Sequence, residues 1–202
     1  MRGLNDAPTP LERQLMGEPA AATNSALDAF QLAREKFLAG ERIDMSALAA
    51  ELGVNRVTLY RWVGSRERLL VEVLWSLATT ALERERARAS TRGAERIVQI
   101  VGGLVRATLA NPGMSRFLAD EGDLAMRLLT RQDHVFQPRL IDAVEGMLAE
   151  EVGRGALELP ADLRDVAFTI VRIVESYVYL DRITGEEPDA DRAESIIRLL
   201  LR

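Results

Sequence analysis

The chain has 202 residues, with 26 basic and 31 acidic side chains, a net charge of −5, one histidine and no cysteine. This composition excludes disulfides, thiolate metal sites and His-rich metal sites. No apolar run approaches the roughly 20 residues of a membrane span, and we expect no signal peptide and no membrane association. Strand-like alternation is absent, so the sequence predicts an all-α protein of about nine or ten helices. We expect it to be cytoplasmic and to need no cofactor.

The N-terminal residues carry several prolines and no helical stripe. Pro8, Pro10 and Pro19 fall within residues 1–23, which we therefore interpret as a flexible tail. Ser25 and Asp28 have the spacing of a capping box. They predict the start of a first helix that ends at Gly40.

Residues 44–68 have the pattern of a helix-turn-helix. Asp44 is suited to cap the first short helix, and Gly53 can adopt the left-handed conformation that ends it. Asn55 is suited to cap a second helix, whose inward face carries Leu59, Trp62 and Val63. The segment therefore predicts two short helices joined by a tight turn at residues 53–54.

The outer face of the second helix has the chemistry of a DNA-binding surface. Val57 and Arg61 lie opposite the apolar face, and Arg56 lies in the first turn, the part of a recognition helix that reaches base edges. Residues 56–68 contain four arginines and one glutamate, whereas residues 1–70 are neutral overall. The basic character is therefore local, as phosphate contact requires. Two alternatives stay open: Tyr60 as a packing residue, and Arg61 as a solvated charge.

The run from about Leu27 to Leu70 resembles the DNA-binding domain of the TetR family of bacterial transcriptional regulators. The resemblance is carried by Leu48-Ala49, Leu52-Gly53-Val54, Thr58-Leu59-Tyr60, Val63, Arg66 and Leu69-Leu70. It implies that Thr58, Tyr60 and Arg66 contact phosphates. It also implies that Ser46, Arg56 and Val57 face bases. The full predicted DNA-binding set is Ser46, Asn55, Arg56, Val57, Thr58, Tyr60, Arg61, Ser65 and Arg66.

Arg66 follows Ser65, which is suited to cap the next helix. The helix N-terminus and the guanidinium are therefore expected to share one phosphate.

Glycine and proline residues divide the remaining chain into further helices. They are predicted over about 65–89, 94–110, 114–120, 122–130, 132–153, 160–184 and 189–201. We assign residues 24–70 to a DNA-binding domain and residues 71–202 to a regulatory domain for ligand binding and dimerisation.

The helix over 161–184 is apolar on most of its surface, which indicates burial on two sides. One side is expected to face its own domain and the other a partner subunit. Together with the helix over 189–201 it predicts a four-helix homodimer interface; a central helix of a monomer's core is the alternative. The predicted interface residues are Ile170, Val174, Val178, Ile196 and Leu200.

A ligand pocket is predicted between the helices that cover residues 65–153. Its predicted lining is Trp75, Phe117, Met126, Leu129, His134, Phe136, Met147 and Tyr177. Each apolar member can also be a plain core residue, and His134 can be a surface residue. Gly102-Gly103 inside an apolar helix indicates close helix contact or room for a ligand. Glu175 is expected to pair with Arg172 or with an arginine of the partner subunit, and ligand contact is its alternative role.

The segments 111–118, 173–177 and 185–189 resemble an actinobacterial subgroup of the TetR family that includes regulators of quorum-quenching lactonase genes. This resemblance implies a lactone-like or acyl-chain effector.

We therefore expect a ligand-responsive repressor that binds a palindromic double-stranded DNA operator as a homodimer and is released by a small apolar or lactone-like effector. The alternative is a constitutive dimeric DNA-binding regulator whose C-terminal domain docks a protein partner. No catalytic residues are expected, because the sequence has no phosphate-binding glycine loop and no nucleophile with a suitably spaced base.

Overall fold

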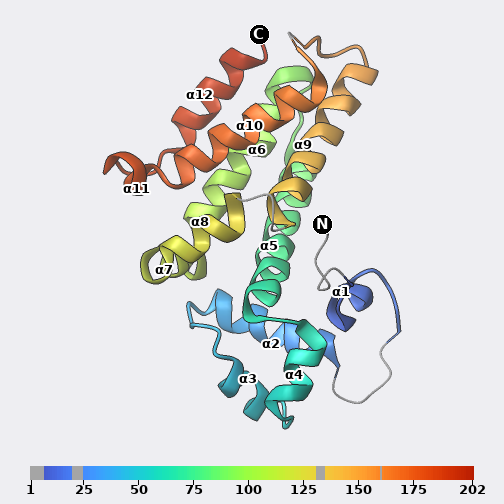
Figure 1. The fold of residues 1–202 in the computed structure, drawn as a ribbon. Helices are drawn as coiled ribbons and strands as arrows, with labels where there is room; N and C mark the ends of the chain where they lie inside the picture. Colours follow the sequence, from blue (N-terminus) through green and yellow to red (C-terminus); the bar gives the residue numbers. More distant parts are fainter. Residues whose placement is uncertain (1–6, 20–24, 131–134, 160) are drawn as a thin grey trace, which may run out of the picture. The chain divides into compact units, whose positions relative to one another are not determined.

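The computed structural model describes residues 7–19, 25–130, 135–159 and 161–202, and every regular element within these ranges is an α-helix (Figure 1). The all-α prediction is therefore confirmed. Twelve helices lie within these ranges, two more than the ten segments predicted. The additional helices are α1 (Pro10–Leu15) and α11 (Leu180–Thr184). None of the helices in the described ranges is long and apolar enough to cross a membrane.

The helices form two compact units. Unit 1 comprises residues 1–75 and 112–121, and unit 2 comprises residues 76–111 and 122–202. Unit 1 therefore contains α7 (Pro112–Asp120), which lies in the predicted regulatory domain. Its helices are α1, α2 (Ala26–Leu38), α3 (Met45–Glu51), α4 (Arg56–Val63), the start of α5 (Arg66–Arg88) and α7 (Pro112–Asp120).

Helix α2 provides the central apolar face of unit 1. Its predicted capping box is present: the backbone N–H of Ser25 donates to Asp28 at 2.6 Å, and that of Asp28 donates to the Ser25 hydroxyl at 3.3 Å. Ala29, Phe30, Ala33 and Phe37 are buried along one side. The predicted end of the helix is also confirmed, because Gly40 adopts a φ of +73°.

Helix α1 contradicts the prediction of a flexible tail over residues 1–23. Thr9 and Glu12 form a capping box, with Pro10 at the first helical position, where its missing N–H costs nothing. Leu11 is 1% exposed, and α1 packs against both α2 and α4. Residues 1–6 and 20–24 of the predicted tail lie outside the described ranges.

Helix α7 packs on α2 through a glycine and an aromatic pair. Gly113 fits against the backbone oxygen of Phe37, where a Cβ atom would collide. The rings of Phe37 and Phe117 meet edge to face at 5.9 Å between centroids. Phe117 therefore packs in the core of unit 1, and its role in lining a pocket stays a prediction.

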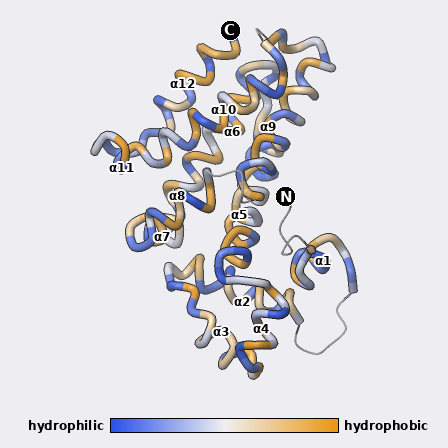
Figure 2. Tube along the Cα trace, viewed as in Figure 1, coloured by the Kyte–Doolittle hydropathy of each residue, from blue (hydrophilic) through white to orange (hydrophobic). Residues whose placement is uncertain are grey.

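Unit 2 is a bundle that includes the second half of α5. Its other helices are α6 (Gly93–Leu109), α8 (Gly122–Thr130), α9 (Phe136–Gly153), α10 (Leu163–Val178), α11 and α12 (Ala190–Leu200). Helix α10 packs on α9 and on α6, and α12 packs on α6 and α10 (Figure 1). Apolar residues recur along these helices with polar residues between them, as amphipathic packing requires (Figure 2).

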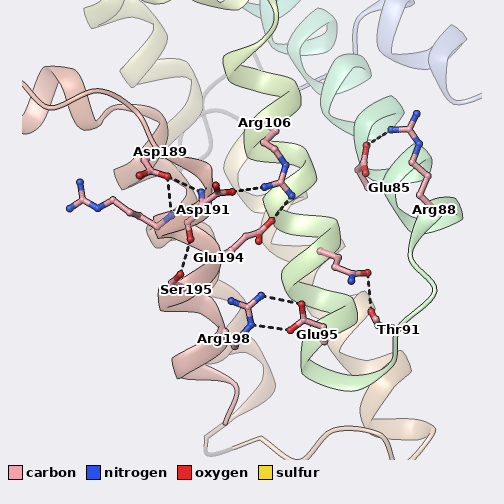
Figure 3. Close-up of polar contacts among 12 residues, drawn as sticks. Glu85, Arg88, Thr91, Glu95, Arg106, Asp189, Asp191, Glu194, Ser195 and Arg198 are labelled. Atoms are coloured by element: carbon pink, nitrogen blue, oxygen red, sulfur yellow. Dashed lines mark hydrogen bonds and ion pairs between the residues drawn. The ribbon is translucent and has the colours of Figure 1, made fainter.

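Glycines at the middle of α6 admit charged side chains from two neighbouring helices. Gly102 leaves room for Glu194 of α12, and Gly103 leaves room for Glu85 of α5. Glu194 pairs there with Arg106 at 2.5 Å, and Arg198 of α12 pairs with Glu95 of α6 at 2.9 Å (Figure 3). Close helix contact is therefore the reason for the glycine pair.

The predicted dimer interface needs a correction. Ile170, Val174 and Val178 of α10 are 0%, 7% and 6% exposed within a single chain, so they form the core of unit 2. Ile196 is 41% exposed, and Leu200 is half-buried. When a helix is apolar on nearly all sides, its sequence pattern does not show which side faces its own core. The side of α10 that we expected to contact a partner subunit is buried within the single chain.

Candidate DNA-binding surface

The helix-turn-helix has the local geometry that its sequence predicts. An oxygen of Asp44 accepts hydrogen bonds from the backbone N–H groups of Ser46 and Ala47, both at 2.8 Å. These two bonds hold the pKa of Asp44 below its ordinary value. Asn55 accepts from the N–H of Thr58 at 2.7 Å, and Gly53 has a φ of +66°. Both predicted caps and the turn glycine are confirmed.

Helix α4 separates a buried side from a solvent side. Leu59 and Val63 are fully buried, and Trp62 is half-buried. On the other side Val57 is 77% exposed and Tyr60 is 37% exposed, although both are large apolar residues.

Charge lies beside these exposed side chains. The Arg56 guanidinium carbon is 5.9 Å from the centre of the Tyr60 ring, and Arg61 is also exposed. We call the exposed set the recognition surface: Ser46, Arg56, Val57, Tyr60 and Arg61. Among the other predicted DNA-binding residues, Asn55 is exposed, and Thr58 and Ser65 are half-buried.

Arg66 was expected to share a phosphate with the start of α5, but its guanidinium is hydrogen-bonded to protein atoms. Its Nη1 and Nη2 atoms donate to the two carboxylate oxygens of Glu121 at 2.8 and 2.6 Å, and its Nε donates to the backbone oxygen of Ile43 at 2.7 Å. The two side chains are 18% and 14% exposed. The hydrogen bonds from Arg66 lower the pKa of Glu121 against the opposing effect of burial. The carboxylate of Glu121, the residue after α7, thus occupies the guanidinium of Arg66, which was predicted to bind a phosphate.

Arg42 adds a second positive charge to Glu121. Its Nε lies 3.4 Å from a carboxylate oxygen of Glu121, and its side chain is 71% exposed. The acidic group therefore lies between one half-buried and one exposed guanidinium.

Arg68 has an acidic partner as well. Its Nε and Nη2 atoms donate to Glu12 of α1 at 3.1, 2.8 and 2.6 Å. Burial raises the pKa of Glu12, but the hydrogen bonds from Arg68 and Thr9 outweigh burial, and the net shift is downward. Two of the four arginines within residues 56–68 are therefore neutralised by glutamates from outside that segment. No local sequence signal indicates these pairs, because the partners are 55 and 56 residues apart.

The predicted ligand-pocket residues that the structure describes are distributed over both units. Met126, Leu129, Phe136 and Met147 lie on α8 and α9 of unit 2, and all but the half-buried Met126 are buried. Trp75 is the last residue of the first segment of unit 1. Tyr177 is half-buried beneath the guanidinium of Arg192, at 5.6 Å. His134 lies outside the described residues.

Buried polar side chains of unit 2 lie beside the apolar residues of α9 and α10. Gln137, which the sequence analysis did not single out, donates to Glu175 at 3.3 Å, and both residues are 7% exposed. Glu175 also pairs with Arg172, as predicted. The Tyr179 hydroxyl donates to the backbone oxygen of Ala125 at 3.4 Å, and burial raises its pKa. Within the described ranges no group of three His, Cys, Asp or Glu side chains could hold a metal ion.

The fold contains a helix-turn-helix within a chain whose described elements are all helices, and comparison with known proteins identifies its class. The family described as tetracyclin repressor-like, C-terminal domain, matches residues 92–202, more than half of the chain. The chain therefore belongs to the TetR family, whose members are DNA-binding regulators and not enzymes and are generally ligand-responsive repressors. A comparison with curated protein sequences finds no match.

Solved structures share the fold over most of the chain. The transcriptional repressor QsdR of R. erythropolis is 27% identical, with a TM-score of 0.79 over 87% of this chain and 93% of that one. A protein of Rhodococcus sp. RHA1 described as a transcriptional regulator is 22% identical, with a TM-score of 0.60 over 88% and 95%. FadR of Bacillus subtilis, solved in complex with stearoyl-CoA, is 16% identical, with a TM-score of 0.53 over 87% and 97%.

The Arg66–Glu121 pair predicts an acid-sensitive contribution to stability. Because the pKa of Glu121 is lowered in the folded protein, the contribution is complete above the ordinary glutamate pKa of about 4.3 and is lost as the pH falls through the lowered value. We expect Glu121→Gln to reduce the free energy of unfolding by about 1–3 kcal/mol at pH 7. The deficit should shrink towards pH 3 when urea unfolding is measured at both pH values.

The matched control is Asp120→Asn. Asp120 pairs with Arg116 on the surface, where the two side chains are 55% and 63% exposed, so this change should have little effect. A deficit in Glu121→Gln that stays constant with pH, or no deficit at all, would contradict the assigned role of the pair.

Proposed function

We propose that the protein is a homodimeric repressor that acts in the cytoplasm, reads a palindromic operator through α4 and leaves it when a small effector binds unit 2. The observation that carries this proposal is the recognition surface. A helix whose inner residues Leu59 and Val63 are fully buried presents Val57, 77% exposed, beside Arg56 and Arg61. Such an exposed apolar residue between two cations has the chemistry of a major-groove contact.

Arg56 is the residue that we assign to base reading. It is the first residue of α4, and recognition helices contact base edges with their N-terminal residues. An arginine can pair bidentately with guanine, and an apolar side chain such as Val57 suits a thymine methyl group. Tyr60, stacked against Arg56, limits the conformations of the guanidinium and leaves its donors available.

Arg56→Ala tests this assignment. We expect operator affinity to fall about tenfold or more and the preference at one base position of each half-site to be lost, because a bidentate pair contributes about 1–3 kcal/mol of discrimination. The measurement is selection of binding sites from random duplexes, followed by titration of the selected site.

Arg127→Ala, which removes an exposed arginine of α8 in unit 2, is the charge-matched control and should select the same sites as the unchanged protein. An unchanged base-preference profile for Arg56→Ala would refute base reading by this residue.

Exposed apolar residues on α10 and α12 support a homodimer. Phe168 is 46% exposed, Ile196 41% and Leu199 58%. Phe168 lies near the start of α10 and Leu199 near the end of α12, and the two helices pack against each other. We therefore move the proposed interface from Ile170, Val174 and Val178 to these exposed residues, with Ile196 and Leu200 kept. A symmetric dimer supplies two copies of α4, and reading a palindrome requires them to lie about 34 Å apart or a multiple of it.

Phe168→Glu and Leu199→Glu should each yield monomers that lose operator affinity, because each places a charge in an apolar contact. Light scattering measures the state of association. Val152→Glu, which changes a residue 39% exposed on α9, should leave it unaltered. If both interface variants are still dimers at micromolar concentration, this surface is not the homodimer interface.

Unit 2 has the composition of a site for a small effector with an apolar body and a polar group. Met126, Leu129, Phe136 and Met147 supply apolar side chains on α8 and α9. Gln137 of α9 and Glu175 of α10 add a buried, hydrogen-bonded polar pair to the same unit. The same fold in FadR of Bacillus subtilis was solved with a bound stearoyl-CoA. Together with the sequence resemblance, these features favour an acyl lactone or a related amphiphile. Such a molecule releases the operator only if it binds the operator-free conformation more tightly than the operator-binding conformation. Otherwise it does not shift the equilibrium between the two.

The effector proposal predicts that acyl lactones raise the melting temperature, with a rise that saturates with concentration, and release the operator. Gln137→Leu should abolish both responses to the lactone and leave operator binding intact, because it removes the amide and keeps the volume. The corresponding free fatty acids test whether the apolar chain suffices. No rise with any member of an acyl-lactone series would exclude this effector class.

A further inference from the structure

Helix α1 has no assigned role, although it is firmly held in unit 1. A helix of six residues is not stable in isolation, so its order depends on docking. Leu11 supplies the apolar contact at 1% exposure, and Thr9 is 8% exposed. The contacts of α1 are with α2 and with α4, the helix of the recognition surface.

Glu12 links α1 to the segment that follows α4. One carboxylate oxygen accepts from the backbone N–H of Thr9 at 2.6 Å, and the same oxygen accepts from Nη2 of Arg68 at 2.6 Å. The other oxygen accepts from Nε and Nη2 of Arg68. Glu12, which belongs to the capping box of α1, therefore also fixes the position of α1 against the first turn of α5. The backbone oxygen of Ala7 accepts a further, longer hydrogen bond from Arg68 at 3.4 Å.

The C-terminal end of α4 lies beneath this contact. Gly64 ends α4 with a φ of +78°, and its N–H donates to the backbone oxygen of Tyr60 at 2.8 Å. A Cβ atom at Gly64 would lie 3.0 Å from Cγ2 of Thr9 and 3.0 Å from Cδ of Arg68. Thr9 and Arg68 thus both pack against the glycine that ends α4, on the side where a Cβ atom would lie.

We infer that α1 is a positioning element for the recognition helix: through Leu11 and the Glu12–Arg68 pair it fixes the C-terminal end of α4, and thereby the angle at which Arg56 and Val57 meet DNA. The inference rests on the proposed function of α4. Arg68 acts here through Glu12 and Gly64 and makes no phosphate contact of its own. The caps of α3 and α4 lie outside α1, so α4 keeps its own helical start when α1 is released.

The test compares Glu12→Gln, Arg68→Gln and the double variant on a selected operator. If α1 positions α4, each single variant should weaken binding about fivefold or more, and the double variant should be no worse than either alone, because both remove one interaction. The slope of log affinity against log salt should stay unchanged. The reversed pair, Glu12→Arg with Arg68→Glu, should recover part of the affinity.

A phosphate contact by Arg68 predicts different results. Glu12→Gln would then leave affinity unchanged or raise it, whereas Arg68→Gln would reduce the salt slope by about 0.9 for each lost contact. Either result overturns the inference. Glu18→Gln is the control, because the Arg13–Glu18 pair of the same segment is exposed and should be neutral.

A second measurement does not depend on DNA. Hydrogen exchange of the free protein should show faster exchange of the backbone amides at residues 61–64 in Glu12→Gln and in Leu11→Ala, and unchanged exchange in α9. If the unchanged protein selects no DNA sequence, the proposed function fails. If it selects an operator that the single variants bind equally well, or if the amides of α4 are unaffected, only the positioning role fails.

Discussion

Two guanidinium–carboxylate contacts at the first turn of α5 hold unit 1 in its observed form. Arg66 contacts Glu121 of the α7 segment, and Arg68 contacts Glu12 of α1. Both join segments more than 50 residues apart to the helix-turn-helix, and in both the carboxylate side chain is less than a fifth exposed. Arginine suits this position because its planar fork remains charged and meets both oxygens of a carboxylate.

This use of arginine reduces the positive charge available for the proposed contact with DNA. The sequence has a local excess of three positive charges over residues 56–68, but the two paired arginines contribute to internal contacts. The proposed recognition surface therefore relies on Arg56 and Arg61 for its positive charge, and it also includes the exposed Val57 and Tyr60. Fewer phosphate contacts mean a smaller salt-dependent, sequence-independent share of affinity. In a chain with a net charge of −5, such an interface favours selectivity over general attraction to DNA.

The features that local chemistry determines could be predicted from the sequence, and those that depend on distant partners could not. Asp44, Asn55 and Gly53 act within a few residues of their own position, and all three have the predicted geometry. Helix α1 could have been found, because Thr9 and Glu12 have capping-box spacing and proline is favoured at the first helical position. In the prediction above, Pro10 indicated a flexible tail together with Pro8 and Pro19.

The partners of Arg66 and Arg68 have no such local signal. The same limit applies to α10, where an apolar pattern around most of the helix left open which side is internal. The buried positions of Ile170, Val174 and Val178 follow from packing against α9 and α6, which no periodicity within α10 encodes.

The central claim is that Arg56 reads DNA while Arg66 and Arg68 hold the helix-turn-helix in place. It is tested most directly by a crystal structure of the protein bound to a selected operator. We expect Arg56 to lie on a base edge, with Arg66 still on Glu121 and Arg68 still on Glu12 at hydrogen-bond distance, about 2.7–3.2 Å. A structure in which either Arg66 or Arg68 leaves its glutamate for a DNA phosphate would contradict it.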